Sequence, residues 1–262
     1  MKRPLYYLKI WWLMSKNSFM TWLAQKMLLL IFLTAKIMRF AFFAGFVYFI
    51  SKGAKSLAGY NAPQVIFFFL TFNIIDIFSQ FLFREVYRFR PLIISGDFDL
   101  ILTKPYSSLF RSLMGGADLI DLITVPPLIF AVIYVGALLD PSRLQIVLYL
   151  LLLINGFLIA TAFHISVLAL AIITLEIDHL VMIYRDLTNL GRFPIDIYKE
   201  PLRGILTYLL PIGMMVSVPA KALMGLMSLK GIAVSFAVGI VLIVMSVKFW
   251  HFALTKYSSA SS

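Results

Sequence analysis

Apolar residues are gathered into blocks long enough to cross a lipid bilayer, and no other feature of the sequence constrains the fold as strongly. Residues 65–83 and 145–175 are two such blocks. A hydrocarbon core of about 30 Å is crossed by roughly 20 helical residues, at about 1.5 Å each. Charged residues make up only 13% of the chain, against roughly a quarter in soluble domains. We therefore expect an all-α, polytopic membrane protein and exclude a soluble fold.

About six transmembrane helices account for these blocks, in a single transmembrane domain over residues 1–262. Lys36 and Arg39 fall inside the first block, residues 28–50, where a cation at mid-bilayer costs roughly 2.5 kcal/mol or more. Shifting this span to about 33–52 would let both side chains reach the cytoplasmic interface. The other clear spans are expected at 63–83, 116–139, 145–175 and 231–254.

The stretch from residue 172 to residue 225 is compatible with two topologies. Residues 176–203 are too polar for a helix that faces lipid, because they carry several charged side chains. In one topology, residues 203–227 form the fifth span. In the other, a polar helix over about 172–190 crosses the membrane, and the proline-rich segment 191–225 dips back in from the outside. Both topologies return the C-terminus to the cytoplasm.

The N-terminal segment, residues 1–27, is basic and aromatic and lacks the features of a removable signal peptide. Lysines alternate there with tyrosines and tryptophans, which predicts an interfacial elbow helix. Several basic residues precede Asp76, the first acidic residue, so the N-terminus is expected in the cytoplasm. The net charge of +11 is spread over such membrane-flanking segments, which favours the lipid bilayer over nucleic acid as partner. The expected location is the bacterial inner (plasma) membrane, with multiple spans and both termini cytoplasmic.

Few residues could support catalysis or bind a cofactor. The chain has no cysteine, and its histidines, His164, His179 and His251, lack the spacing of a metal site. No glycine-rich loop ends in Gly-Lys-Ser or Gly-Lys-Thr, so we expect neither ATP hydrolysis nor a cofactor in this chain. For His164, a hydrogen bond between packed helices is favoured over a catalytic role.

Polar residues inside the spans are candidates for a translocation path or for helix packing. Asn73, Asp76 and Gln80 fall at positions i, i+3 and i+7, so they share one helical face. Such a stripe cannot face lipid. It lines a substrate or ion path, or it forms interhelical hydrogen bonds, and both interpretations stay open. His164 in the fourth span is a further candidate of the same kind.

Two acidic residues, Asp118 and Asp121, begin the third span one turn apart. Negative charge at a helix N-terminus caps free N–H groups and complements the helix dipole. Capping and dipole stabilisation are therefore the expected roles of both side chains.

Residues 84–111 form a polar segment between the second and third spans and are expected in the cytoplasm. The segment interleaves basic, aromatic and aliphatic residues. A short helix there would present an apolar face on a charged loop, which predicts a docking site for a cytosolic partner. The alternative is an amphipathic segment that rests on lipid headgroups.

Two stretches carry a family resemblance, and the number and order of the spans extend it over the chain. Residues 96–105 read GDFDLILTKP, and residues 193–225 read FPIDIYKEPLRGILTYLLPIGMMVSVPAKALMG. Both resemble permease subunits of type 2 ATP-binding-cassette (ABC) exporters, in the viologen-exporter-like branch. In the second stretch, the matching positions are Pro194, Tyr198, Leu202, Arg203, Pro211, Pro219, Ala220, Leu223 and Gly225.

The resemblance implies a dimer of this permease with an identical copy or a sister subunit. It also implies a separate cytosolic ABC ATPase that holds ATP and magnesium and drives the spans between inward and outward access. It favours the second topology, although basic residues such as Arg185 and Arg203 fit the cytoplasm better. Residues 84–111 then become the coupling segment, with candidate contacts at Arg88, Arg90, Gly96, Asp97, Asp99, Lys104 and Pro105.

Two other classes of function compete with the ABC permease. A standalone secondary transporter or channel would use Asp76 as an intramembrane ion or proton site. An intramembrane enzyme would need a nucleophile and a base, and the sequence offers no such pair. The sequence does not identify the substrate, because an apolar, aromatic interior suits a drug, a lipid or a hydrophobic peptide alike.

Overall fold

The computed structural model describes residues 3–53, 56–174 and 177–258, and within these ranges its regular structure is helical, without strands. Five long helices are α2 (Lys26–Gly53), α3 (Ala62–Phe83), α7 (Leu119–Ala137), α8 (Arg143–Thr174) and α12 (Leu229–Lys256). The other elements are α1 (Arg3–Ala24), η1 (Arg84–Arg88), α4 (Phe89–Ile94), α5 (Asp97–Leu102), α6 (Ser108–Leu113), α9 (Ile177–Asn189), η2 (Leu190–Arg192), η3 (Ile195–Ile197), α10 (Leu202–Gly204), η4 (Ile205–Leu209), η5 (Gly213–Ser217) and α11 (Val218–Leu223).

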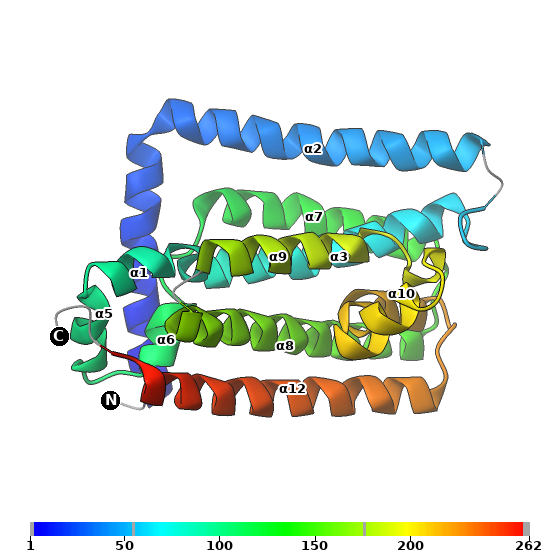
Figure 1. Cartoon of the computed structure of the whole chain (residues 1–262). Helices are drawn as coiled ribbons and strands as arrows, with labels where there is room; N and C mark the ends of the chain where they lie inside the picture. The colour runs from blue at the N-terminus through cyan, green and yellow to red at the C-terminus, as the bar shows by residue number, and fades with distance from the viewer. Residues whose placement is uncertain (1–2, 54–55, 175–176, 259–262) are drawn as a thin grey trace.

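The five long helices lie roughly parallel to one another, and both chain termini lie at the same end of the bundle (Figure 1). We call this the terminal end, and the opposite end, where α3, α8 and α12 begin, the distal end. All five helices are long and apolar enough to cross a membrane, and a bent pair of shorter helices raises the number to six if it is one span. The expectation of an all-α polytopic membrane protein with about six spans is confirmed.

The predicted span boundaries agree with the helix ends to within a few residues, apart from the first. The block at 145–175 is α8, and the block at 231–254 is α12. The first span is longer than expected, because α2 continues unbroken from Lys26 to Gly53. Most of its side chains are exposed, and it touches the rest of the bundle through α1, α3 and α7.

Between α8 and α12, a 13-residue helix, α9, is followed by a bent pair of helices, which can be one broken span or a re-entrant loop. Helix α9 runs back along the bundle beside α8, and the chain then folds into a compact unit at the distal end (Figure 1). We call residues 190–223 the bent unit. Its two halves, Leu202–Leu209 and Gly213–Leu223, meet at 75°. A straight fifth span over 203–227 does not occur, because Pro211 lacks a backbone N–H and π-helical turns flank it.

The predicted N-terminal elbow, residues 1–27, contains α1, which lies across the bundle at the terminal end (Figure 1). Its one buried residue, Ser15, accepts a hydrogen bond from the Ala117 N–H at 3.2 Å. Gly116 lies against the same helix: an added Cβ would come within 2.7 Å of the Ser18 Cβ. Close contact with the start of α7 therefore fixes α1 on the bundle.

Three hydrophobic clusters hold the described helices together, and two of them are large. The largest one surrounds α3 and includes side chains of α7, α8 and the bent unit. The second one lies at the terminal end, where Trp250 of α12 is 1% exposed and packs against Phe89 and Phe98 with ring centroids 6.4 Å away. The second cluster therefore attaches α4 and α5 rigidly to the end of α12.

Candidate functional site

The predicted coupling segment, residues 84–111, folds into η1, α4, α5 and the start of α6 at the terminal end (Figure 1). Arg88 and Arg90 are exposed at the junction of η1 and α4. Lys104 and Pro105 are exposed in the loop after α5. These four candidates therefore lie on the outside of the bundle, as a contact with another protein requires.

Gly96, Asp97 and Asp99 build the turn between α4 and α5. Gly96 is the N-cap of α5 with φ of 78°, a left-handed conformation that favours glycine. The Ser95 hydroxyl donates a hydrogen bond of 2.7 Å to Asp97, whose carboxylate lies in the first turn of the helix. Burial and the neighbouring Asp99 carboxylate raise the pKa of Tyr257 to about 12. These three candidates therefore take part in the turn and the first helical turn of the segment.

The sequence-based candidates missed the apolar tip of this segment, formed by Ile94, Leu100 and Leu102. Their side chains are 62%, 60% and 40% exposed. The alternate residues of the same helices, such as Phe98, point into the core. The amphipathic spacing of LIISGDFDLIL carried this signal, but which face would be covered depends on packing against Trp250.

A buried ion pair fixes the two ends of the segment to each other. Glu85 is 8% exposed, and its Oε1 lies 2.6 Å from Nη1 of Arg111. Gly115 leaves room for this carboxylate, since a Cβ there would lie 2.4 Å from Glu85 Oε2. The segment is thus closed into a loop of fixed shape. The predicted candidates did not include this pair.

The polar residues inside the spans do not form one site. Asn73 is 2% exposed and donates to the Phe69 carbonyl at 2.7 Å, a bond within its own helix. The His164 ring is buried against Tyr184, with centroids 4.8 Å apart, and its Nδ1 lies 2.8 Å from the carbonyl of Ala160. Both hydrogen bonds lie within the helix that carries the side chain, so the hydrogen bond between helices expected for His164 is not seen among the described residues.

Asp76 has different surroundings from the rest of its predicted stripe. It lies within electrostatic range of Tyr87, Tyr184 and Arg192. Gln80 is half-buried on the same face, and the described part of the chain offers it no hydrogen-bond partner. Asp76 therefore lies in a charged region between α3 and α9, and Tyr87 and Tyr184, which also contact His164, stand beside it.

The two acidic residues at the start of α7 have separate partners. Asp118 is the N-cap: its side chain accepts from the Ile120 N–H at 2.8 Å and lies 3.2 Å from Nε of Arg84. Asp121 lies in the first turn and forms an ion pair with Lys36 of α2. The capping role predicted for Asp118 is confirmed. The pairing directs the ammonium of Lys36 towards the start of α7, and the expectation that Lys36 reaches the cytoplasmic interface stays a prediction.

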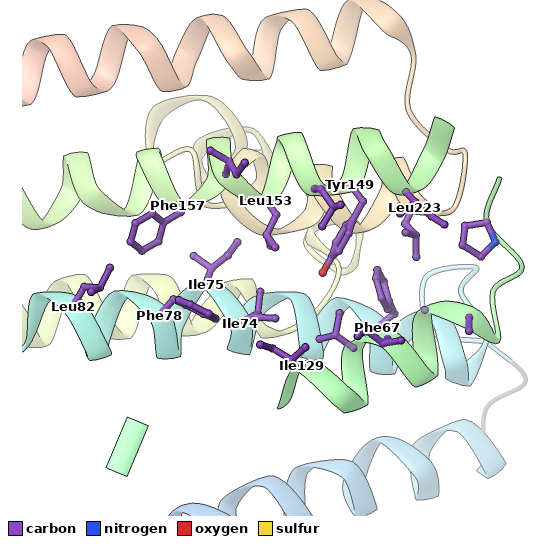
Figure 2. A pocket seen from close by; sticks show the side chains of 18 residues that line it. Phe67, Ile74, Ile75, Phe78, Leu82, Ile129, Tyr149, Leu153, Phe157 and Leu223 are labelled. Carbon is purple, nitrogen blue, oxygen red and sulfur yellow. The ribbon is translucent and has the colours of Figure 1, made fainter. Parts of the chain in front are cut away.

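An apolar cavity of about 600 Å³ lies between α3, α7 and α8 (Figure 2). Rings of Phe67, Phe78 and Phe157 and several aliphatic side chains line it. Its polar group, the Tyr149 hydroxyl, lies 3.4 Å from the Thr71 hydroxyl. The volume is within the range of ligand pockets, roughly 300–1,000 Å³. The cavity can hold an apolar chain but has little to orient a polar one.

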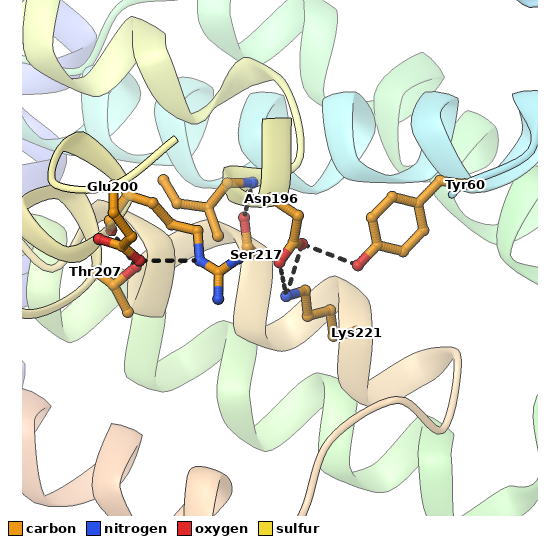
Figure 3. Close-up of polar contacts among 8 residues, drawn as sticks. Tyr60, Asp196, Glu200, Thr207, Ser217 and Lys221 are labelled. Carbon is orange, nitrogen blue, oxygen red and sulfur yellow. Dashed lines mark hydrogen bonds and ion pairs between the residues drawn. The ribbon is translucent and has the colours of Figure 1, made fainter. Parts of the chain in front are cut away.

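A polar cluster at the distal end ties the bent unit to the start of α3 (Figure 3). Asp196 accepts from the Tyr60 hydroxyl at 2.9 Å and lies 2.7 Å from Nζ of Lys221. Ser217 accepts from the Ile195 N–H at 3.2 Å. Asp196 thus joins three segments of the chain through one carboxylate. Sequence reasoning did not select it, because its partners are far away along the chain.

The carboxyl group of Asp196 stays ionised although it is partly buried. Burial disfavours the carboxylate, but the hydrogen bond and positive charge of Lys221 and the hydroxyl of Tyr60 outweigh it, so the pKa of Asp196 lies below its ordinary value. Burial and the Asp196 carboxylate raise the pKa of Tyr60. The cluster is therefore ionised on Asp196 and protonated on Tyr60 at neutral pH.

Replacing Asp196 with asparagine should lower the free energy of unfolding by about 1.5–3 kcal/mol at pH 7, the range for hydrogen bonds to charged groups. Because the pKa is depressed in the folded protein, the advantage of the wild type is constant above about pH 5 and shrinks as the pH falls through about 4. Denaturant unfolding of both proteins in detergent between pH 7 and pH 3 measures it. A difference that does not change over this range would contradict the ionised cluster.

One comparison with known proteins identifies a family for the chain. Among the described residues, no group of three or more His, Cys, Asp or Glu side chains could hold a metal ion. No curated protein and no solved structure matches the chain. The family described as ABC-2 family transporter protein matches residues 35–261, which is most of the sequence. The chain therefore belongs to the ABC-2 transporter family and is a multi-pass membrane permease of that family.

Proposed function

We propose that this chain is the membrane-spanning subunit of an ABC exporter in the bacterial inner membrane. It forms the translocation pathway as a dimer, with an identical copy or a sister subunit, and a separate cytosolic ATPase drives it. The two motifs at 96–105 and 193–225 support assignment to the viologen-exporter-like branch. Membership of the ABC-2 family supports an ATPase partner in general terms.

The observation that carries the proposal is the exposed apolar tip of Ile94, Leu100 and Leu102. Exposed apolar side chains on a charged surface are typical of a docking element that enters a groove on another protein. Arg88 and Lys104 flank the tip and can provide electrostatic complementarity at its rim. The tip therefore has the chemistry of a small interface with an apolar centre and a polar rim.

The same segment can transmit movement of the ATPase into the membrane. Phe89 and Phe98 pack on Trp250, and the Glu85–Arg111 ion pair closes the loop. Since cores are close-packed and resist compression, a displacement of the tip would move the ends of α3 and α12 with it. Rigid coupling of this kind is what converts closure of the ATPase into rocking of the spans.

The proposed orientation places the terminal end in the cytoplasm. The N-terminal segment and residues 84–111 bring an excess of lysine and arginine to that end. Basic residues argued against placing the bent unit outside the cytoplasm, but two of them have acidic partners there. Nε of Arg203 lies 3.5 Å from Glu200, and Lys221 pairs with Asp196. The positive-inside pattern is thus compatible with the second topology.

The test is a charge placed in the apolar tip. The tagged chain is purified from native membranes in mild detergent, and the co-purifying ATPase is quantified by mass spectrometry and by ATP hydrolysis. Leu100→Asp should reduce recovery of the ATPase about tenfold or more, because burying an unpaired carboxylate at an interface costs at least about 1.4 kcal/mol. Leu100 is exposed, so the fold should survive the change.

Leu229→Asp is the matched control. Leu229 is 83% exposed at the distal start of α12, where an acidic residue suits a helix N-terminus. Recovery of the ATPase should equal that of the wild type. A wild-type chain that purifies alone and shows ion-coupled flux in vesicles, abolished by Asp76→Asn, would replace this proposal with a standalone secondary transporter.

A further inference from the structure

Three guanidinium groups converge on the space between α2, α3 and α9. Arg192, at the end of η2, lies within electrostatic range of Arg39 on α2, Arg185 on α9 and Asp76 on α3. Arg185 also lies over the ring of Tyr87, 5.9 Å from its centre. The four charged side chains come from four different elements, so the fold has brought them together.

Positive charge exceeds negative charge in this region. Two nearby cations have their own partners, since Lys36 pairs with Asp121 and Arg84 pairs with Asp118. In the part of the chain that the structure describes, the guanidiniums of Arg39, Arg185 and Arg192 form no ion pair. Among the described carboxylates, Asp76 is the one within electrostatic range of Arg192, so positive charge exceeds negative charge among these four side chains.

Two of these cations lie near the middle of the spans and not at their ends. Arg192 lies 5.7 Å from the ring centre of Phe72, the eleventh of the 22 residues of α3. Arg39 is the fourteenth of the 28 residues of α2. At about 1.5 Å per residue, both positions are roughly 15 Å or more from either helix end. Unpaired cations at this depth are costly and mark functional sites.

Each of the three guanidiniums lies near an aromatic ring. The Cζ atoms of Arg192, Arg39 and Arg185 lie 5.7, 5.7 and 5.9 Å from the ring centres of Phe72, Phe40 and Tyr87. A cation–π contact uses the flat face of a guanidinium, whereas its five N–H donors point outward in the plane. Planar donors of this kind match the oxygens of a carboxylate, sulfate or phosphate.

An aromatic track continues from the guanidiniums towards the distal end. Arg39, Phe43 and Phe46 fall at i, i+4 and i+7 of α2 and share one face. Phe193 directly follows Arg192, and its ring lies 5.3 Å from Phe43 and 6.3 Å from Phe46. The guanidiniums, which can bind an acid group, therefore lie next to an aromatic surface that can bind the apolar part of the same molecule.

We propose that Arg39, Arg185 and Arg192 form a binding site for the acid group of an anionic amphiphile, whose apolar body lies along Phe43, Phe46 and Phe193. This inference rests on the proposed function, because it names the substrate class of the same permease. Asp76 opposes the anion and prevents it from binding too tightly to be released. The acid group can belong to a free amphiphile or to a lipid headgroup, and recognition is the same for both.

The test is a binding assay on the full chain in nanodiscs of phosphatidylcholine, with empty nanodiscs as background. The probe is undecanoic acid with a dansyl group at its far end, compared with its methyl ester and with the matched trimethylammonium compound. The acid should bind at least about tenfold more tightly than either analogue. Arg39→Gln with Arg192→Gln should weaken binding of the acid about tenfold or more, without affecting the ester.

Two further variants separate recognition from folding. Asp76→Asn should tighten binding of the acid, and a folding defect cannot produce a gain of affinity. Arg143→Gln, at the exposed distal start of α8, removes a guanidinium from elsewhere in the chain and should change nothing. Preferential binding of the trimethylammonium compound, or equal acid binding by the wild type and the double glutamine variant, would overturn the inference.

A second nanodisc composition distinguishes the two sources of the anion. Displacement of the acid by phosphatidylglycerol would assign the site to a lipid headgroup, and undiminished binding would assign it to a free amphiphile. Either result supports recognition of an acid group. The binding assay needs no ATPase, so a negative result in it would not contradict the coupling proposal. Conversely, if no ATPase co-purifies, the selectivity of the site for an acid group can still be measured.

Discussion

Replacement of Gly156 by alanine should destabilise the folded protein by about 3 kcal/mol or more, the upper range for overpacked cores. Gly156 lies in α8 where the bent unit crosses it. A Cβ at this position would lie 2.3 Å from the backbone oxygen of Met215 and 3.0 Å from Cδ1 of Ile75. A backbone oxygen within a π-helical turn cannot turn aside as a flexible side chain can. The methyl group must therefore push the bent unit away from α8.

Gly45→Ala is the matched control for this prediction. Gly45 lies inside α2, and nothing is within 4 Å of the position its Cβ would occupy. Alanine there should be neutral or should stabilise the helix by up to about 1 kcal/mol. Unfolding by titration with dodecyl sulfate in micelles measures both variants. If Gly156→Ala unfolds at the same concentration as Gly45→Ala, then α8 and the bent unit do not approach each other as closely as described.

The spans themselves could be predicted from the sequence because length and hydropathy decide them. The block at 145–175 became α8 (Arg143–Thr174), since about 20 apolar residues cannot stay unburied in water and cannot expose their backbone in lipid. The start of α7 was also predictable. Asp118 was expected to cap it, and local capping depends on residues only a few positions apart.

The shape of the bent unit could not be predicted in the same way. Residues 202–223 are apolar enough to suggest a crossing, and only Pro211 hinted at a break. Whether such a stretch spans the membrane straight or folds back depends on the partners of its polar groups. Asp196 is such a partner, because it accepts a hydrogen bond from Tyr60 and forms an ion pair with Lys221. These contacts connect residues up to 136 positions apart, and no local pattern records them.

The candidate coupling site was located in the sequence, but its residues were selected only in part. Charged residues such as Lys104 were selected because charges are rare in this mostly apolar sequence. The apolar tip around Leu100 became visible only when Phe98 was seen packed against Trp250. In an amphipathic segment, burial of one face defines the function of the other.

The ion pair between Lys36 and Asp121 provides the second large effect. Lys36→Met should reduce stability by about 3–4 kcal/mol at pH 7, because it leaves a buried carboxylate, 4% exposed, without its partner. The loss of stability has an upper bound, since the unpaired carboxylate of Asp121 can become neutral by taking up a proton. Protonating a group of ordinary pKa near 3.9 at pH 7 costs about 4 kcal/mol, and this cost falls by about 1.4 kcal/mol for each pH unit. The penalty should therefore shrink to about 1.5 kcal/mol at pH 5.

A double-mutant cycle separates the ion pair from other effects of losing Lys36. Lys36→Met with Asp121→Asn should cost at least about 2 kcal/mol less than the sum of the single changes, because the second change removes the stranded charge. Lys26→Met, at the exposed start of the same helix, should change stability by no more than about 0.5 kcal/mol. Additive single effects would mean that Lys36 and Asp121 act independently. In that case, α2 would be held by its packing contacts with α1, α3 and α7, and its position beside the guanidinium site would be free to change during transport.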